Sequence, residues 1–178
     1  VCSIIDFQEV IMSHELVLVL DFGGQYNQLI ARRVREHKIY CEVKSYKTPV
    51  EEIKALNPKG IIFTGGPNSV YLDESPRMPR EIFELGIPIL GICYGAQFMV
   101  YALDGEIGPA HDASLAEYGR TECEVDTTSP LFDGIEQNTI VWMSHNDYIT
   151  RVPDGFKSIG HSIKCPFGAM ADDNRKLY

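Results

Sequence analysis

The residues best suited to chemistry form the short segment 91–95, in which one cysteine stands between small residues. An apolar run at 87–90 precedes the segment and a helical pattern follows it, so we predict that Cys93 lies where a buried strand turns sharply into a helix. The small flanking residues Gly91 and Gly95 would let the strand and the helix approach closely. A thiolate at such a turn can attack an acyl carbon, so the segment predicts acyl transfer through a thioester, with Cys93 as the nucleophile.

A second loop could supply the groups that stabilise a negative charge developing on oxygen. Gly65 and Gly66 follow an apolar run and can present backbone N–H groups without hindrance from side chains. We expect these N–H groups, together with that of Tyr94, to form an oxyanion hole. The N-terminus of the helix after the turn is also expected to lower the pKa of the Cys93 thiol and so favour the thiolate.

These loops need a scaffold of alternating strands and helices, and the first hundred or so residues have that pattern. Continuous apolar runs predict strands covered on both faces, and residues at helical spacing predict the helices between them. In the first helix, the apolar stripe consists of Tyr26, Leu29, Ile30 and Val34. The strands are expected at 16–20, 39–43, 60–64 and 87–90, and the helices at 26–34, from 49 onward, at 80–85 and at 96–103.

The position of the loops follows from a parallel arrangement of these strands. In an open parallel sheet, ligands bind beyond the carboxyl ends of the strands, where the loops 21–25, 65–69 and 93–97 would meet. The second half of the chain changes character, with short strands predicted at 121–125, 139–143 and 156–159. We therefore predict an α/β fold with a mostly parallel sheet, helices on both faces and extra antiparallel strands.

Composition narrows the class of protein. The chain has 178 residues, 44% of them hydrophobic and 23% charged, as expected of one globular domain with a sizeable core. Its net charge of −9 argues against partners such as nucleic acid or an anionic membrane, and no apolar run is long enough to span a bilayer. The five cysteines form no CxxC pair and no metal-like spacing, which predicts reduced thiols in a cytoplasmic protein and no metal site. Residues 1–12 are expected to be a leader without a role in the fold, which leaves one domain at 13–178.

Six segments form a joint pattern that is more specific than the turn at Cys93 alone: 20–26, 30–36, 64–71, 90–97, 117–120 and 142–147. With them, the chain from 17 to 178 resembles the class I glutamine amidotransferases, the type with a Cys-His-Glu triad, and most closely the glutaminase domain of GMP synthases. A tyrosine after the nucleophile, here Tyr94, is typical of that branch, whereas several sister families have leucine there. The resemblance implies a flavodoxin-like fold.

The resemblance also implies glutamine hydrolysis. Cys93 would attack the side-chain amide of glutamine, ammonia would leave, and the glutamyl thioester would be hydrolysed to glutamate. The ammonia would pass to a GMP synthetase domain of the ATP-pyrophosphatase type, in cis or in trans, which aminates XMP to GMP. No cofactor is expected in the present domain, since ATP and Mg²⁺ belong to the synthetase. The residues implied to contact glutamine are Gln97, at the start of the helix, and Ser144, His145, Asn146 and Asp147, in a loop that lines the site.

The sequence departs from the family pattern in two places. In this family the general base and its orienting acid lie in a His-Pro-Glu segment, after a strand that begins close to Leu177 and Tyr178, where this sequence ends. We therefore expect the domain at 13–178 to be incomplete at its C-terminus and inactive by itself, because a general base is commonly worth about 10²–10⁴-fold in rate. Asp104 stands where the family usually has the first of two glycines, which is expected to affect only the end of a helix.

Other interpretations remain open. The chain could be an amidotransferase subunit that serves another acceptor, as in carbamoyl phosphate, CTP or anthranilate synthesis, or a non-catalytic module that binds glutamine or regulates a partner. Cys93 could be a buried structural cysteine. His145 is expected to line the pocket or hold a loop rather than replace the missing base. The cysteines expected to be passive are Cys41, Cys123 and Cys165.

Overall fold

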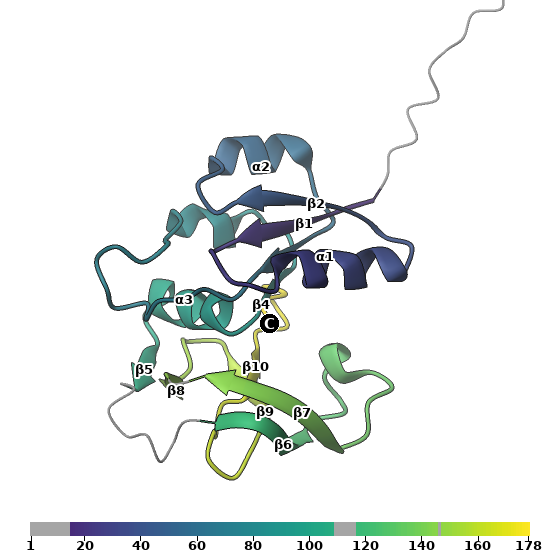
Figure 1. Ribbon diagram of the computed structural model, residues 1–178, viewed down its shortest axis with the longest axis vertical. Coiled ribbons are helices and arrows are strands. Elements are labelled where there is room, and N and C mark those ends of the chain that lie inside the picture. Colours follow the sequence, from purple (N-terminus) through teal and green to yellow (C-terminus); the bar gives the residue numbers. More distant parts are fainter. Residues whose placement is uncertain (1–14, 109–116, 146) are drawn as a thin grey trace, which may run out of the picture.

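A four-stranded parallel sheet, in the order β2-β1-β3-β4, lies at the centre of the first half of the chain (Figure 1). The computed structural model describes residues 15–108, 117–145 and 147–178. Leu18, Val19 and Leu20 are fully buried, as expected of a strand that is covered on both faces. The strands are β1 (Leu16–Asp21), β2 (Tyr40–Ser45), β3 (Gly60–Phe63) and β4 (Ile89–Gly91).

Helices cover both faces of this sheet, as the sequence predicts. α1 packs on one face through Ala31, beside Val19 of β1. The other helices pack on the opposite face around Phe22, Phe63 and Phe98, whose ring centroids lie 5.3–6.0 Å apart. The helices of this half are α1 (Asn27–Glu36), α2 (Val50–Leu56), the 3₁₀ helix η1 (Arg80–Glu84) and α3 (Tyr94–Ala102). None of the helices in the described ranges combines the length and the apolar character needed to cross a membrane.

The second half of the chain forms two antiparallel sheets, a four-stranded one in the order β10-β9-β6-β7 and a two-stranded one of β5 and β8. The predicted antiparallel strands are confirmed in β6, β7 and β9, whereas β5, β8 and β10 have three or four residues each, too few for a pattern. The elements are β5 (Glu106–Gly108), β6 (Glu117–Val125), the 3₁₀ helix η2 (Pro130–Phe132), β7 (Asn138–His145), β8 (Tyr148–Arg151), β9 (Lys157–His161) and β10 (Ala169–Ala171).

Residues 176–178 lie beside β4 and extend the central sheet. The Ile89 N–H donates to the Lys176 carbonyl at 3.0 Å, and the Gly91 N–H donates to the Tyr178 carbonyl at 2.8 Å. Leu177 is fully buried and pairs with Ile89 in the parallel sense. These bonds pair residues 176–178 with β4 in the parallel sense, at the place where the resemblance implies a strand.

The face that α1 turns to the sheet matches the predicted apolar stripe only in part, since Ile30 and Val34 pack against the buried cluster around Val19. Tyr26, just before the helix, and Leu29 are exposed, whereas Asn27 and Ala31 are buried. The small side chain of Ala31 lets the helix lie close to β1 and β2, and the Asn27 amide donates to the Asp21 carboxylate at the end of β1. Half of the predicted stripe therefore faces the sheet, and Ala31 and Asn27 complete that face.

The C-terminal end of α3 shows why a glycine would suit the position that Asp104 occupies. The Gly105 N–H donates to the Val100 carbonyl at 2.8 Å and the Asp104 N–H to the Tyr101 carbonyl at 3.4 Å, which is the pattern of a Schellman motif. The residue at its left-handed position is Asp104, with φ 65°, a conformation that suits glycine. Its carboxylate lies 2.8 Å from the Arg80 guanidinium, but both side chains are exposed, so this ion pair contributes little to stability.

Asp104→Gly is therefore expected to raise the free energy of unfolding by up to about 1 kcal/mol, because glycine adopts a positive φ without the strain of a Cβ. Urea denaturation followed by circular dichroism measures the change. Asp104→Asn is the matched control, since it removes the charge and keeps the side chain. A gain in stability for Asp104→Asn equal to that of Asp104→Gly would show that charge, not backbone strain, matters at this position.

Candidate active site

Cys93 lies at the apex between β4 and α3, in a backbone conformation that residues with side chains rarely adopt, with φ 54° and ψ −111°. The flanking glycines make this turn possible. A Cβ on Gly91 would lie 2.7 Å from the Ala96 nitrogen, and one on Gly95 would lie 2.6 Å from the Phe63 carbonyl oxygen. The segments β3, β4 and α3 thus touch through their backbones, and the predicted strand–turn–helix is confirmed as a nucleophile elbow.

The loop that contains Gly65 and Gly66 lies directly against this elbow. A Cβ on Gly65 would be 3.8 Å from the Cβ of Cys93, so the two loops are neighbours, as predicted. Gly66 packs on the ring of Tyr94, where a Cβ would come within 2.9 Å of the ring carbon Cγ. Since the Tyr94 side chain is buried in the core, this residue can offer the site only its backbone.

A cavity of about 730 Å³ opens over Cys93, between the loops of the central sheet and the turn from β7 to β8. The Cys93 Sγ lies 3.7 Å from the Ser144 carbonyl oxygen, and the Gln97 side-chain amide donates to the Asp147 carbonyl at 3.0 Å. The structure therefore brings residues from distant parts of the sequence to one site. Of the predicted site residues, the cavity is lined by Cys93, Gly65, Gly66, Gln97, Ser144, His145 and Asp147, whereas Asn146 lies outside the described residues.

The cavity has further lining residues that sequence reasoning did not single out. Tyr26 and Trp142 line it from segments that belong to the joint motif pattern, so a signal for them was present. Cys165 and Phe167 come from the loop between β9 and β10, where no local pattern indicates a site. Their place at the cavity follows only from the folded arrangement of the second half of the chain.

The surroundings of the Cys93 thiol raise its pKa, so the predicted lowering was wrong in its net direction. Desolvation of the sulfur by nearby protein atoms is the largest cause, although the residue itself reaches the surface. The Tyr94 N–H lowers the pKa as a helix N-terminus should, and the Asp147 carboxylate raises it. One backbone donor does not offset the cost of desolvating a thiolate beside a carboxylate. The thiol therefore needs a base to take its proton.

Within the described residues, no imidazole hydrogen-bonds to the Cys93 thiol. His145 lines the cavity, and its Nε2 lies 3.5 Å from Oε2 of Glu117. The other described cysteines are buried, and burial followed by the charge of Glu117 raises the pKa of Cys165 to about 11. Cys93 is thus the exposed thiol of the described part of the chain.

This combination of an elbow cysteine, a glycine loop and a parallel sheet with added antiparallel strands defines a class of protein. Residues 18–178 match the family model of the class-I glutamine amidotransferases, and the chain belongs to that family. The predicted family and fold class are confirmed.

Similar proteins within the family point to one kind of enzyme. GMP synthase (glutamine-hydrolyzing) from Clostridium novyi is 57% identical over 167 residues, and the same enzyme from Clostridium acetobutylicum is 52% identical over 167 residues. These alignments cover 94% of this chain and 32% of each relative, so the chain spans about a third of the length of the curated relatives it matches. A solved structure from Thermoplasma acidophilum, provisionally described as one subunit of a GMP synthase, has a TM-score of 0.77 at 25% identity, over 93% of this chain and 81% of that one.

Removal of the Asp147 charge should make Cys93 more reactive at neutral pH. The thiolate is the form that is alkylated, and the Asp147 carboxylate raises the pKa of Cys93, so Asp147→Asn should shift the pH profile of alkylation to lower pH. Iodoacetamide labelling between about pH 6 and pH 10, with peptide mass spectrometry at Cys93, measures this shift. Asp133→Asn, at an exposed position after η2, should leave the profile in place. If both variants behave like the wild type, Asp147 does not influence the thiol.

Proposed function

We propose that this domain hydrolyses glutamine to glutamate and ammonia, and that the ammonia serves the ATP-dependent amination of XMP to GMP. The observation that carries the proposal is the accessible Cys93 at a strained elbow, held against the Gly65 loop at the floor of a cavity. The names of the relatives at 52% and 57% identity support the choice of XMP as acceptor.

In the proposed reaction, the Cys93 sulfur attacks the side-chain amide carbon of glutamine. The C–N bond breaks after the nitrogen has received a proton, ammonia leaves, and a glutamyl thioester remains on the sulfur. Water then attacks the thioester, which releases glutamate and restores the thiol. The backbone N–H groups of Gly65, Gly66 and Tyr94 are proposed to stabilise the negative charge on the carbonyl oxygen in both steps.

The cavity wall is proposed to hold the amino acid end of glutamine. Asp147 lies beside the thiol and could pair with the substrate's ammonium group, and the Gln97 bond to its carbonyl fixes its position. Ser144 places its carbonyl over the sulfur, and His145 stands at the same wall. In this proposal these residues orient glutamine, and none of them transfers a proton.

A complete reaction cycle needs a base that the described residues do not place beside Cys93. The raised pKa of Cys93 leaves its thiol protonated at neutral pH, and the His145 imidazole lies beside Glu117. We propose that the base and its acid come from the family's His-Pro-Glu segment, expected after the strand that begins at 177. Residues 1–178 alone would then hold the nucleophile but turn glutamine over slowly.

The proposed partner is a synthetase domain of the ATP-pyrophosphatase type, in cis or in trans. That domain would hold ATP, Mg²⁺ and XMP, and it would receive the ammonia. The curated relatives are about three times as long as the region they share with this chain, which leaves room in them for such a domain.

Glutamate release should depend on Cys93 and on the base. In protein that includes the His-Pro-Glu segment, Cys93→Ser should abolish glutamate release, whereas Cys41→Ser should not, because Cys41 is buried between α1 and the sheet. Residues 1–178 alone should be about 10²–10⁴-fold slower than the longer protein. An enzymatic glutamate assay, together with transfer of isotope-labelled amide nitrogen to XMP, measures both steps.

Each result of this assay separates the hypotheses. Glutamate release that survives Cys93→Ser would contradict the proposed nucleophile. Release without transfer of the label to XMP in the presence of the synthetase would contradict GMP synthesis and favour another acceptor. Glutamine binding without turnover in the longer protein would favour a non-catalytic module.

A further inference from the structure

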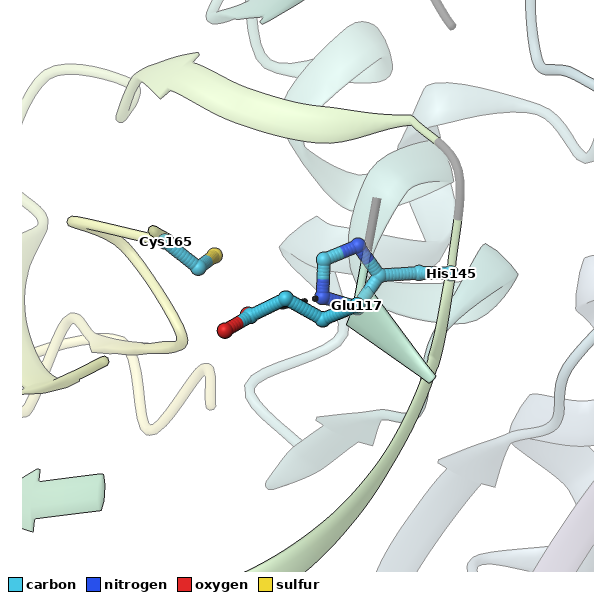
Figure 2. Close-up of side chains that lie close together, drawn as sticks. All are labelled: Glu117, His145 and Cys165. Atoms are coloured by element: carbon cyan, nitrogen blue, oxygen red, sulfur yellow. Dashed lines mark ion pairs between the residues drawn. The ribbon is translucent and has the colours of Figure 1, made fainter. Parts of the chain in front are cut away.

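Three side chains with metal-binding atoms lie together at the wall of the cavity (Figure 2). Glu117 comes from β6, His145 from β7 and Cys165 from the loop between β9 and β10. One ligand atom from each side chain lies within 4.8 Å of the other two. Figure 2 shows the Cys165 sulfur pointing toward the other two side chains.

Two polar atoms of this cluster are buried without a hydrogen bond to any residue in the described ranges. They are Oε2 of Glu117 and Nδ1 of His145. Glu117 is only 7% exposed, and its Oε2 lies 3.5 Å from Nε2 of His145, which is ion-pair distance for a protonated ring (dashed line in Figure 2) but too long for a hydrogen bond. A buried carboxylate oxygen without a donor is costly, and a bound cation would satisfy it directly.

Hydrogen bonds of Ser162 fix the Glu117 side chain and the backbone of Cys165. The Ser162 hydroxyl donates to Oε1 of Glu117 at 2.7 Å, and it accepts the backbone N–H of Cys165 at 2.9 Å. Glu117 and His145 also face each other as paired residues of β6 and β7, so the strand register sets their spacing. Outer contacts of this kind orient the ligands in protein metal sites.

We propose that Glu117, His145 and Cys165 bind a divalent metal ion of the zinc class. Cysteine sulfur, imidazole nitrogen and carboxylate oxygen are together ligands for Zn²⁺, whereas Ca²⁺ and Mg²⁺ prefer oxygen alone. The ligands of a tetrahedral zinc ion lie about 3.3–3.8 Å apart, so small side-chain rotations would bring the three atoms into place. With three protein ligands, a fourth position stays open for water.

The cluster also has a route by which an ion can enter. His145 and Cys165 both line the cavity over Cys93, so the open position of the ion would face that space. Bound there, the ion would join β6, β7 and the loop before β10, and so brace the wall that carries Ser144. This role is structural, and it does not depend on whether the domain hydrolyses glutamine.

This proposal differs from the expectation of no metal site and of a passive Cys165. The three ligands come from separate parts of the chain, so they do not have the short sequence spacing that identifies zinc ribbons or zinc fingers. Only the pairing of β6 with β7, and the turn after β9, bring them together.

Cobalt binding tests the site, because Co²⁺ replaces Zn²⁺ and gives a charge-transfer absorption band when it is bound by a thiolate. The experiment is done on purified protein carrying Cys93→Ser, since the exposed Cys93 thiol could itself bind a soft metal. We expect one Co²⁺ per chain, a thiolate-to-cobalt band, loss of that band when Zn²⁺ is added, and a higher Tm with Zn²⁺.

Variants then assign the band to the cluster. In the same background, Cys165→Ser should remove the band, and Glu117→Gln should weaken Co²⁺ binding by at least about tenfold. Cys41→Ser, a buried cysteine elsewhere in the fold, is the matched control and should change neither. Two results would overturn the proposal. One is the absence of the band in protein that carries only Cys93→Ser, and the other is a band that persists in folded protein with Cys165→Ser as well.

Discussion

The close approach of three backbone segments at the elbow is the constraint on which the rest of the structure depends. There is no room for a Cβ at Gly91 or Gly95, because β4 and α3 touch there and α3 lies on the carbonyl of Phe63 in β3. This contact forces the chain through a positive φ at Cys93, which persists because the aromatic core around Phe63 and Phe98 holds both elements in place. The position of the thiol is thus a result of backbone packing.

The two halves of the chain contribute different parts of the site. The parallel sheet supplies the nucleophile and the glycine loop, both at the carboxyl ends of its strands, as parallel sheets commonly do. The antiparallel strands supply the opposite wall, which is tied to α3 by the bond from Gln97 to the Asp147 carbonyl. That wall also carries the Asp147 charge, which adds to the partial desolvation of the sulfur and makes the thiol harder to ionise than a cysteine at a bare helix terminus.

The features that could be predicted from the sequence are those with local signals. The apolar runs of β1 and β3 and the glycines around Cys93 each depend on neighbours in the chain, and the structure has them in the predicted places. The sign of the pKa shift at Cys93 depends instead on burial and on Asp147, which is distant in sequence. The contact of Glu117 with His145 and Cys165 depends on the register of β6 and β7 and on the turn after β9. Neither feature can be recognised from a short stretch of sequence.

Covalent labelling by an electrophilic glutamine analogue, a diazoketone, tests most directly the claim that this elbow presents Cys93 to glutamine. Peptide mass spectrometry identifies the side chain that has reacted. The account predicts a single adduct on Cys93, and it predicts that an excess of glutamine prevents the reaction. Labelling spread over other cysteines, or labelling of Cys93 that glutamine does not slow, would contradict it.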